Sequence, residues 1–188
     1  MKIRLYLKIV DTKTGKVEVD RESHSWVIQF PQILCAHMAS KYTDQIRDTG
    51  NTLRNYQTTA QAINVNAAAT VITYGIVIGT GTTAEDATQY KLTTQIINGS
   101  GSGQAVHSAV TIVESSVVGT TAIFTVARTF TNNYATADLL VKEIGIYAQV
   151  SLSTTCYFML ARDLENITIV KAGGSKTITY TVTVDNTS

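Results

Sequence analysis

The chain has 188 residues, a net charge of +1 and only 15% charged residues, while 44% of its residues are hydrophobic. This length suits one core, or one domain with an arm, and without a basic excess there is no case for nucleic-acid binding. Threonine, serine, asparagine and glutamine replace the missing charges. Such a surface suits packing against neighbouring subunits, although many β-sandwiches are simply rich in threonine.

The apolar segments are too short to cross a membrane. The longest run, residues 71–78, is interrupted by Thr73 and Gly75, whereas a spanning helix needs about 20 apolar residues. The first residues lack the apolar core and the cleavage site of a signal peptide. We therefore expect folding in the cytoplasm, with Cys35 and Cys156 as free, buried thiols rather than a disulfide.

Residues 2–20 predict a β-hairpin. Apolar and polar residues alternate through residues 2–10, which is typical of a half-buried strand. Turn-forming residues follow at 11–16, and Val17 and Val19 begin a second strand. An isolated hairpin is marginal in water, so we expect this one to join a sheet of its own domain or of a neighbouring subunit.

The one strong helical pattern lies at residues 25–42, where large apolar residues recur at helical spacing. Ser23 or Ser25 could cap its start, and Pro31 is expected to kink the helix or to mark where its regular part begins. Residues 43–70 are small and polar without a period. They predict an extended arm or long loop that becomes ordered on a partner.

From residue 71 onward, strand patterns alternate with turn signals, and no βαβ rhythm is present. Residues 85–95 predict a helical turn or an irregular link, 98–103 a flexible loop and 163–166 a turn. This spacing is typical of a β-sandwich or barrel. The expected strands cover residues 71–78, 106–113, 123–130, 139–148, 157–162, 167–170 and 177–184.

The fold class expected from these patterns is all-β, a jelly-roll-like β-sandwich with an N-terminal hairpin, one helix and an extended arm. Residues 1–70 would form an anchoring region and residues 71–188 the sandwich. The last strand alternates apolar residues with an entirely threonine face, which suits water or a polar partner.

No motif indicates catalysis. The run Gly79-Thr80-Gly81-Thr82-Thr83 lacks the lysine of a Walker motif and the third glycine of a dinucleotide fingerprint, so we expect a tight turn. His24, His37 and His107 follow no metal-binding spacing. We expect His37 to be a satisfied core or interface group and His107 to be exposed, and no nucleophile elbow supports a Ser-His-Asp triad.

Two pairs of carboxylates have simple explanations. Glu85 and Asp86 could bind a hard cation, but a helix start or a solvated turn explains them more simply. Asp44 and Asp48, with Arg47 between them, have helix-like spacing and are expected on a solvated face.

Charged residues inside the predicted strands need partners. We expect Arg128 to pair with Glu143 or Asp163 across the sheet. A glycan groove lined by Arg128, Tyr147 and Tyr157 is the functional alternative.

Several short segments resemble parts of tailed-bacteriophage virion proteins, in which a small β-sandwich serves in head decoration, head fibres or tails. The resemblance covers about residues 71–185 and brings no catalytic residues. It is carried by Ile78-Gly79-Thr80-Gly81-Thr82-Thr83-Ala84, Tyr90-Lys91-Leu92 with Ile96, Glu143-Ile144-Gly145-Ile146-Tyr147, Leu160-Ala161-Arg162-Asp163 and the Gly173-Gly174 turn before the last strand.

We therefore expect a structural virion protein assembled in the host cytoplasm, rather than an enzyme, with no cofactor, metal, membrane or nucleic acid. Its partners would be itself and other virion proteins, bound by apolar burial and strand addition. A carbohydrate- or receptor-binding module is the alternative, and a hydrolase a distant third. The contact residues expected are Ile3, Leu5, Leu7, Trp26, Phe30, Leu34, Met38, Arg47 and Arg54.

Overall fold

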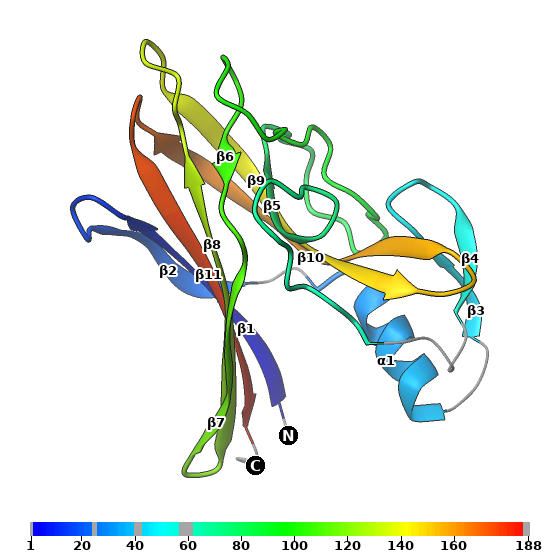
Figure 1. Cartoon of the computed structure of the whole chain (residues 1–188). Helices are drawn as coiled ribbons and strands as arrows, with labels where there is room; N and C mark the ends of the chain where they lie inside the picture. Colours follow the sequence, from blue (N-terminus) through cyan, green and yellow to red (C-terminus); the bar gives the residue numbers. More distant parts are fainter. Residues whose placement is uncertain (1, 24–25, 40–42, 57–61, 186–188) are drawn as a thin grey trace.

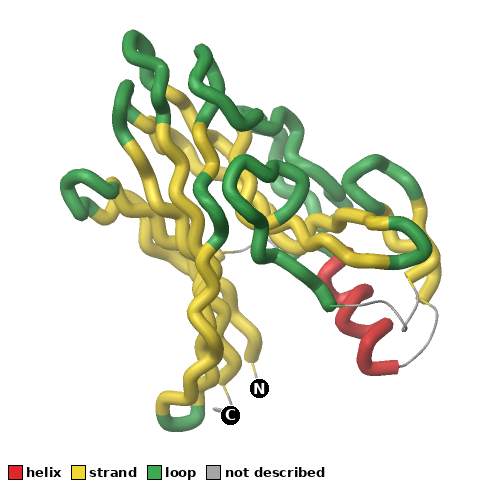
Figure 2. Tube along the Cα trace, in the orientation of Figure 1, coloured by secondary structure: helices red, strands yellow, loops and turns green. Residues whose placement is uncertain are grey.

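A computed structural model describes residues 2–23, 26–39, 43–56 and 62–185 (Figures 1 and 2). The chain is all-β with antiparallel sheets and one helix, which confirms the expected sandwich-like fold class. The elements are β1 (Lys2–Asp11), β2 (Val17–Ser23), α1 (Gln29–Ala39), β3 (Thr43–Arg47), β4 (Leu53–Tyr56), β5 (Gly75–Gly79), β6 (Val106–His107), β7 (Thr111–Val118), β8 (Thr121–Thr131), β9 (Leu139–Ser151), β10 (Thr155–Val170) and β11 (Ser175–Asp185).

A large sheet has the strand order β2-β1-β11-β8-β6, with β7 also pairing with β8. A second sheet has the order β10-β9-β5, and β3 and β4 form a small hairpin. In Figure 1, β9 and β10 run toward α1 and the β3–β4 hairpin, whereas β1, β7, β8 and β11 run downward to the chain ends. The two sheets therefore diverge toward the lower end of the large sheet.

The N-terminal hairpin joins a sheet of its own chain. β1 pairs with β11 over ten residues, from Lys2 opposite Asp185 to Asp11 opposite Lys176. The alternation predicted for β1 holds, because Leu5, Leu7 and Ile9 are almost completely buried. The hairpin is thus part of the large sheet, and a boundary at residues 70 and 71 does not separate it from the C-terminal strands.

The core lies between the two sheets. It contains alternate side chains of β1, β8 and β11 on one side, such as Leu7, Phe130 and Tyr180, and side chains of β9 and β10 on the other, such as Ile144 and Phe158. Burying an apolar side chain of this size stabilises a fold by roughly 1.5–3 kcal/mol. This burial fixes the face that each strand turns inward.

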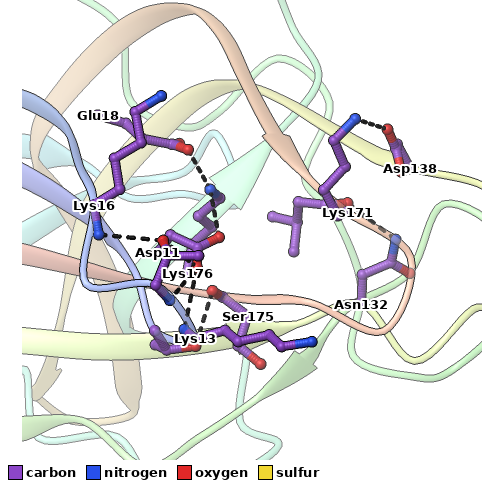
Figure 3. A network of polar contacts seen from close by, with 12 residues as sticks. Asp11, Lys13, Lys16, Glu18, Asn132, Asp138, Lys171, Ser175 and Lys176 are labelled. Carbon is purple, nitrogen blue, oxygen red and sulfur yellow. Dashed lines mark hydrogen bonds and ion pairs between the residues drawn. The ribbon is translucent and has the colours of Figure 1, made fainter.

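A network of polar contacts lies at the end of the large sheet away from the termini, around the β1–β2 turn and the start of β11 (Figure 3). The ammonium of Lys176 is almost fully buried, lies 3.0 Å from Asp11 Oδ2 and contacts Glu18 as well. On a neighbouring turn the exposed Lys171 pairs with Asp138 at 2.7 Å. The Lys176 pairs hold the β1–β2 turn and the start of β11 together, and the Lys171 pair joins the β10–β11 turn to the segment before β9.

The helix is shorter than its sequence pattern. α1 begins at Gln29, so Pro31 lies in its first turn, where a missing backbone N–H breaks no helical hydrogen bond. Ser23 does not cap it, because its hydroxyl donates to Asp163 Oδ2 at 2.8 Å; Ser25 lies outside the described residues. Among the helices of the described chain, none is both long and apolar enough to cross a membrane.

Two sequence expectations about loops are wrong. The expected arm at 43–70 contains the β3–β4 hairpin, and residues 57–61 lie outside the described residues. Within residues 62–70, Asn64 bridges to Gln149 on β9, and Ala67 and Thr70 hydrogen-bond the backbone of Val110 and His107. The expected turn at 163–166 lies within β10, which continues to Val170 with a register shift between Leu164 and Thr168. In the β3–β4 hairpin and at residues 163–166, polar residues that resemble loop residues lie in strands.

Candidate functional site

The contact residues expected on β1 have different surroundings. Ile3 is 39% exposed, whereas Leu5 and Leu7 are 1% and 0% exposed and belong to the chain's own core. All three point to the same face of the strand, because side chains two residues apart share a face. The change from buried to exposed along β1 marks where the second sheet stops covering the first.

This uncovered region, the open end, consists of the inner-face side chains Ile3, Val117, Ala122, Phe124 and Val184. The register places Ile3, Val184, Ala122 and Val117 in one row across β1, β11, β8 and β7. Phe124 follows two residues along β8 and is 37% exposed, and Val117 is 74% exposed. An apolar surface across four strands therefore lies without cover.

The strand β7 borders the open end and is exposed along its whole length. Within the described chain, β7 pairs only with β8. Its register shifts between Val113 and Ser116, and such a bulge restricts edge-to-edge pairing. The free edge thus offers two short segments for strand addition rather than one continuous strand.

The helix adds a second apolar surface. Trp26 and Phe30 stack with ring centroids 4.0 Å apart and are partly buried against the core. Leu34 and Met38 are 38% and 79% exposed. Cys35 between them is also exposed, so the buried position expected for its thiol is wrong, whereas Cys156 is buried as expected. Of the four expected contact residues here, only Leu34 and Met38 lie on the exposed surface.

The two arginines expected in an arm are bound within the chain. Arg54 Nε lies 2.7 Å from Asp48 Oδ2, and Asp48 also accepts a hydrogen bond from the Thr52 backbone N–H at 2.8 Å. Asp48 is only 4% exposed, so the solvated face expected for it is wrong. Arg47 hydrogen-bonds Asn51, and its guanidinium lies 5.6 Å from the Tyr90 ring centre.

The glycine run that resembled a phosphate loop surrounds a carboxylate of the chain itself. Glu143, which is fully buried on β9, accepts hydrogen bonds from the backbone N–H groups of Gly81, Thr93 and Thr94 at 2.8–3.0 Å. A side chain at Gly79 would place its Cβ 2.6 Å from Glu143 Oε1. The glycines are therefore required because the loop backbone approaches the carboxylate closely.

The partner of Glu143 is Arg162 on β10. Its Nε donates to Glu143 Oε2 at 3.0 Å, its Nη1 to Gln89 at 2.9 Å and its Nη2 to the Thr83 carbonyl at 3.0 Å. Both charged side chains are at most 1% exposed. Because their polar atoms are occupied within the chain, this pair fixes the loop at residues 79–95.

Arg128 does not pair with Glu143 or Asp163, which corrects the expected ion pair. It donates to four backbone carbonyls at 2.6–3.3 Å, those of Ala68, Val71, Ile76 and Ser108. Burial lowers the pKa of Arg128 to about 10. The side chain fastens the segment before β5, β5 itself and the link between β6 and β7 to β8.

Asp163 belongs to a different buried network, which sequence reasoning missed. Its carboxylate accepts hydrogen bonds from Ser23 and Tyr180 at 2.8 Å and from Arg21 at 3.2 Å. Arg21 and Ser23 lie on β2 and Tyr180 on β11, so the network joins the large sheet to β10. Burial, together with the neighbouring Asp163, raises the pKa of Tyr180.

The two histidines that the structure describes lie apart and have partners of their own. His107 is fully buried rather than exposed; it hydrogen-bonds the Ala105 carbonyl at 2.9 Å and packs edge-on against Phe130. His37 lies 2.8 Å from the Tyr56 hydroxyl, and His24 lies outside the described residues.

The acidic pair after the glycine loop stabilises turns. Glu85 accepts a hydrogen bond from the Leu164 backbone at 2.8 Å, and Asp86 accepts one from Thr88 at 2.7 Å. The hydroxyl of Thr88 also lowers the pKa of Asp86. In the parts of the chain that the structure describes, no group of three potential metal-ligating side chains is present.

A hollow of about 340 Å³ lies beside the β3–β4 hairpin and is lined by Tyr147, Tyr157, Lys91 and Gln95, among others. Two residues of the expected glycan groove, Tyr147 and Tyr157, therefore come together, whereas Arg128 lies elsewhere. Tyr157 also stacks on Tyr74 with ring centres 6.2 Å apart.

Comparisons with protein-family models, with curated proteins and with solved structures found no match.

Proposed function

We propose that this chain is a structural protein of a tailed-phage virion that assembles with further copies of itself and with neighbouring capsid or tail proteins. The resemblance of residues 71–185 to virion proteins and the low proportion of charged residues support this proposal. The observation that carries it is the open end, because exposed apolar surface that continues a core is typical of a protein–protein contact.

A second copy of the chain suits the open end. Ile3, Val117, Ala122, Phe124 and Val184 carry no charge, so pairing two open ends about a twofold axis would bury no unpaired ion. The free edge of β7 lies beside this surface and can add strand pairing at its border. Apolar burial would then supply most of the free energy of association, and strand addition its orientation.

The test is the oligomeric state of the purified chain. We expect light scattering and native mass spectrometry to detect oligomers whose proportion rises with protein concentration. The substitution Val117→Lys should lower the association constant by at least about tenfold, because it places a charge in the apolar contact.

The matched control is Ser116→Lys. Residue 116 is the neighbour of Val117 on the exposed strand β7, but it points to the opposite face of the sheet, so this variant should associate like the wild type. A wild-type chain that stays monomeric at all concentrations would contradict self-assembly. Equal effects of the two lysines would contradict the open end as the contact.

A further inference from the structure

Two surface hollows differ in how far their polar groups are already occupied. The first, of about 250 Å³, is lined by Trp26, Glu85, Asp86, Gln89 and Arg162. The hydrogen bonds of its charged groups to loop and strand atoms, described above, hold the loop at residues 79–95. This hollow is therefore explained by its structural role.

The second hollow, the tyrosine hollow, retains free polar groups. It is the hollow of about 340 Å³ that Lys91, Gln95, Tyr147 and Tyr157 line, together with threonines such as Thr49. Gln95 Nε2 donates to the Ile72 carbonyl at 2.6 Å, which leaves its oxygen for another partner. Within the described residues, the Tyr157 hydroxyl and the Lys91 ammonium have no hydrogen-bond or ion-pair partner.

The charge of the tyrosine hollow has one sign. No carboxylate lines it. Lys91 stands at its border with its Nζ 5.8 Å from the Tyr90 ring centre, and Arg47 approaches the same ring at 5.6 Å. Two cations therefore share one aromatic ring beside the hollow, and both lack a carboxylate partner in the described part of the chain. A ligand with a negative group would be attracted to this border.

The walls of the tyrosine hollow favour a ligand with an apolar C–H face and hydroxyl groups. Tyr157 lines the hollow, and Tyr74, which does not line it, stacks on that ring with an interplanar angle of 16°. An aromatic ring packs well against apolar C–H surface while its hydroxyl offers a hydrogen bond. Threonine and glutamine groups supply further donors and acceptors. A volume of about 340 Å³ lies at the small end of the range for ligand sites.

We propose that the tyrosine hollow binds an acidic glycan, with a sugar ring against Tyr157 and its carboxylate or phosphate group at Lys91. Hydroxyl groups of the sugar would bond to Gln95 and the neighbouring threonines. This binding is separate from assembly, because the open end and the tyrosine hollow share no residue. A chain that assembles normally and binds no glycan would overturn this inference alone.

The test is a binding measurement with three acidic probes and their neutral counterparts: 3′-sialyllactose against lactose, and a hyaluronan tetrasaccharide and trigalacturonate against their carboxyl-reduced forms. We expect saturation-transfer NMR to detect at least one acidic probe, and titration calorimetry to give its affinity. The substitution Lys91→Gln should lower the affinity for that probe by at least about tenfold, as expected for the loss of a charge-assisted hydrogen bond. The affinity for the neutral counterpart should stay unchanged.

Two further variants separate binding from folding. Tyr157→Phe keeps the ring and should weaken binding a few-fold through loss of the hydroxyl. Lys13→Gln removes an exposed lysine in the distant β1–β2 turn and should change nothing; thermal melts would verify that all variants fold.

Three outcomes would overturn the proposal. The first is no binding of any acidic probe down to an affinity of about 1 mM. The second is equal affinity in wild type and Lys91→Gln. The third is tighter binding of an oligothymidylate than of every glycan, because this would assign the same tyrosines and cations to single-stranded nucleic acid.

Discussion

The covered half and the open end of the large sheet are made from the same alternation of apolar and polar residues, but their surroundings differ. In the covered half, Leu5 and Leu7 meet the second sheet and the buried groups of β10. At the open end, Ile3 and Phe124 continue the same face with more than a third of their surface exposed. Alternation thus determines which face is apolar, but the divergence of the sheets determines how much of that face is buried.

The largest expected effect concerns the second sheet, which covers this half of the large sheet and to which Glu143 attaches the loop at residues 79–95. Glu143→Gln preserves shape but turns one oxygen into an N–H donor, either toward Arg162 and Thr93 or toward Gly81 and Thr94. The buried Arg162 also loses its counter-ion, so we expect a loss of about 3–5 kcal/mol in the free energy of unfolding. Urea denaturation at pH 7 measures it.

The control for that substitution is Glu114→Gln on the exposed strand β7. It should change the free energy of unfolding by less than about 0.5 kcal/mol. A Glu143→Gln variant as stable as this control would mean that Glu143 does not hold the loop.

The next effect compares the two regions directly. Leu7→Ala leaves a cavity in the core and should cost about 2–5 kcal/mol of unfolding free energy. Val117→Ala removes a side chain that is 74% exposed and should cost less than about 0.5 kcal/mol in dilute, monomeric protein. Equal losses by urea denaturation would show that the open end is buried in the isolated chain.

A third effect depends on pH. Burial, with the nearby charge of Arg128, lowers the pKa of His107 to about 4, despite a hydrogen bond to the Ala105 carbonyl. The unfolded chain, with an ordinary histidine pKa of about 6.5, takes up a proton first as the pH falls. The contribution of neutral His107 to the free energy of unfolding should therefore be fully present above pH ~6.5. As the pH falls toward ~4, the free energy of unfolding should decrease by up to about 3 kcal/mol.

Urea titrations between these two pH values measure the slope. The variant His107→Gln cannot take up the proton, so its stability should change much less over the same interval. A wild-type slope that matches this variant would contradict the buried, neutral state of His107.

The smallest effect concerns the outer, polar face of the covered half. The hydroxyls of Thr129 on β8 and Thr177 on β11 lie 2.8 Å apart. Thr177→Val removes this hydrogen bond but leaves Thr129 able to bond water, so we expect a loss of only about 0.5 kcal/mol. Thermal denaturation of the variant beside the wild type would measure it, and a loss as large as that of Leu7→Ala would mean that this face is covered.

The strands could be predicted from the sequence because burial of one face imposes a period of two. The pattern at residues 2–10 gave β1 its inward residues, and the pattern at 177–184 did the same for β11. The β3–β4 hairpin could not be predicted in this way, because its short strands place too few apolar side chains, Ile46 and Tyr56, in the core to show a period of two. Its turn is stabilised by the buried Asp48, which accepts hydrogen bonds from Thr52 and Arg54. The continuation of β10 through residues 163–166 could not be predicted for a similar reason. Asp163 is polar, and its burial depends on hydrogen bonds from distant residues rather than on an apolar pattern.

The candidate sites were predictable only in part. The alternative of a glycan groove placed Tyr147 and Tyr157 together, and both line the tyrosine hollow. Lys91 and Gln95, however, reach it from an irregular segment whose position depends on Glu143. The open end was not predictable, because no local pattern distinguishes Ile3 from Leu5. In the sequence, a charged residue inside an apolar strand, Glu143, indicated that a buried partner must exist. The partner is Arg162 and not Arg128, which the sequence had suggested.

The way in which the glycine loop is attached determines which of its residues can differ between related proteins. Glu143 holds this loop through backbone N–H groups, and Arg162 adds a bond to the Thr83 carbonyl. Exposed positions such as Thr82 and Ala84 can therefore change without loss of the loop's conformation. Distant relatives of this chain should share little here except a Gly-X-Gly, a glutamate 62 residues after its second glycine and an arginine 19 residues further on.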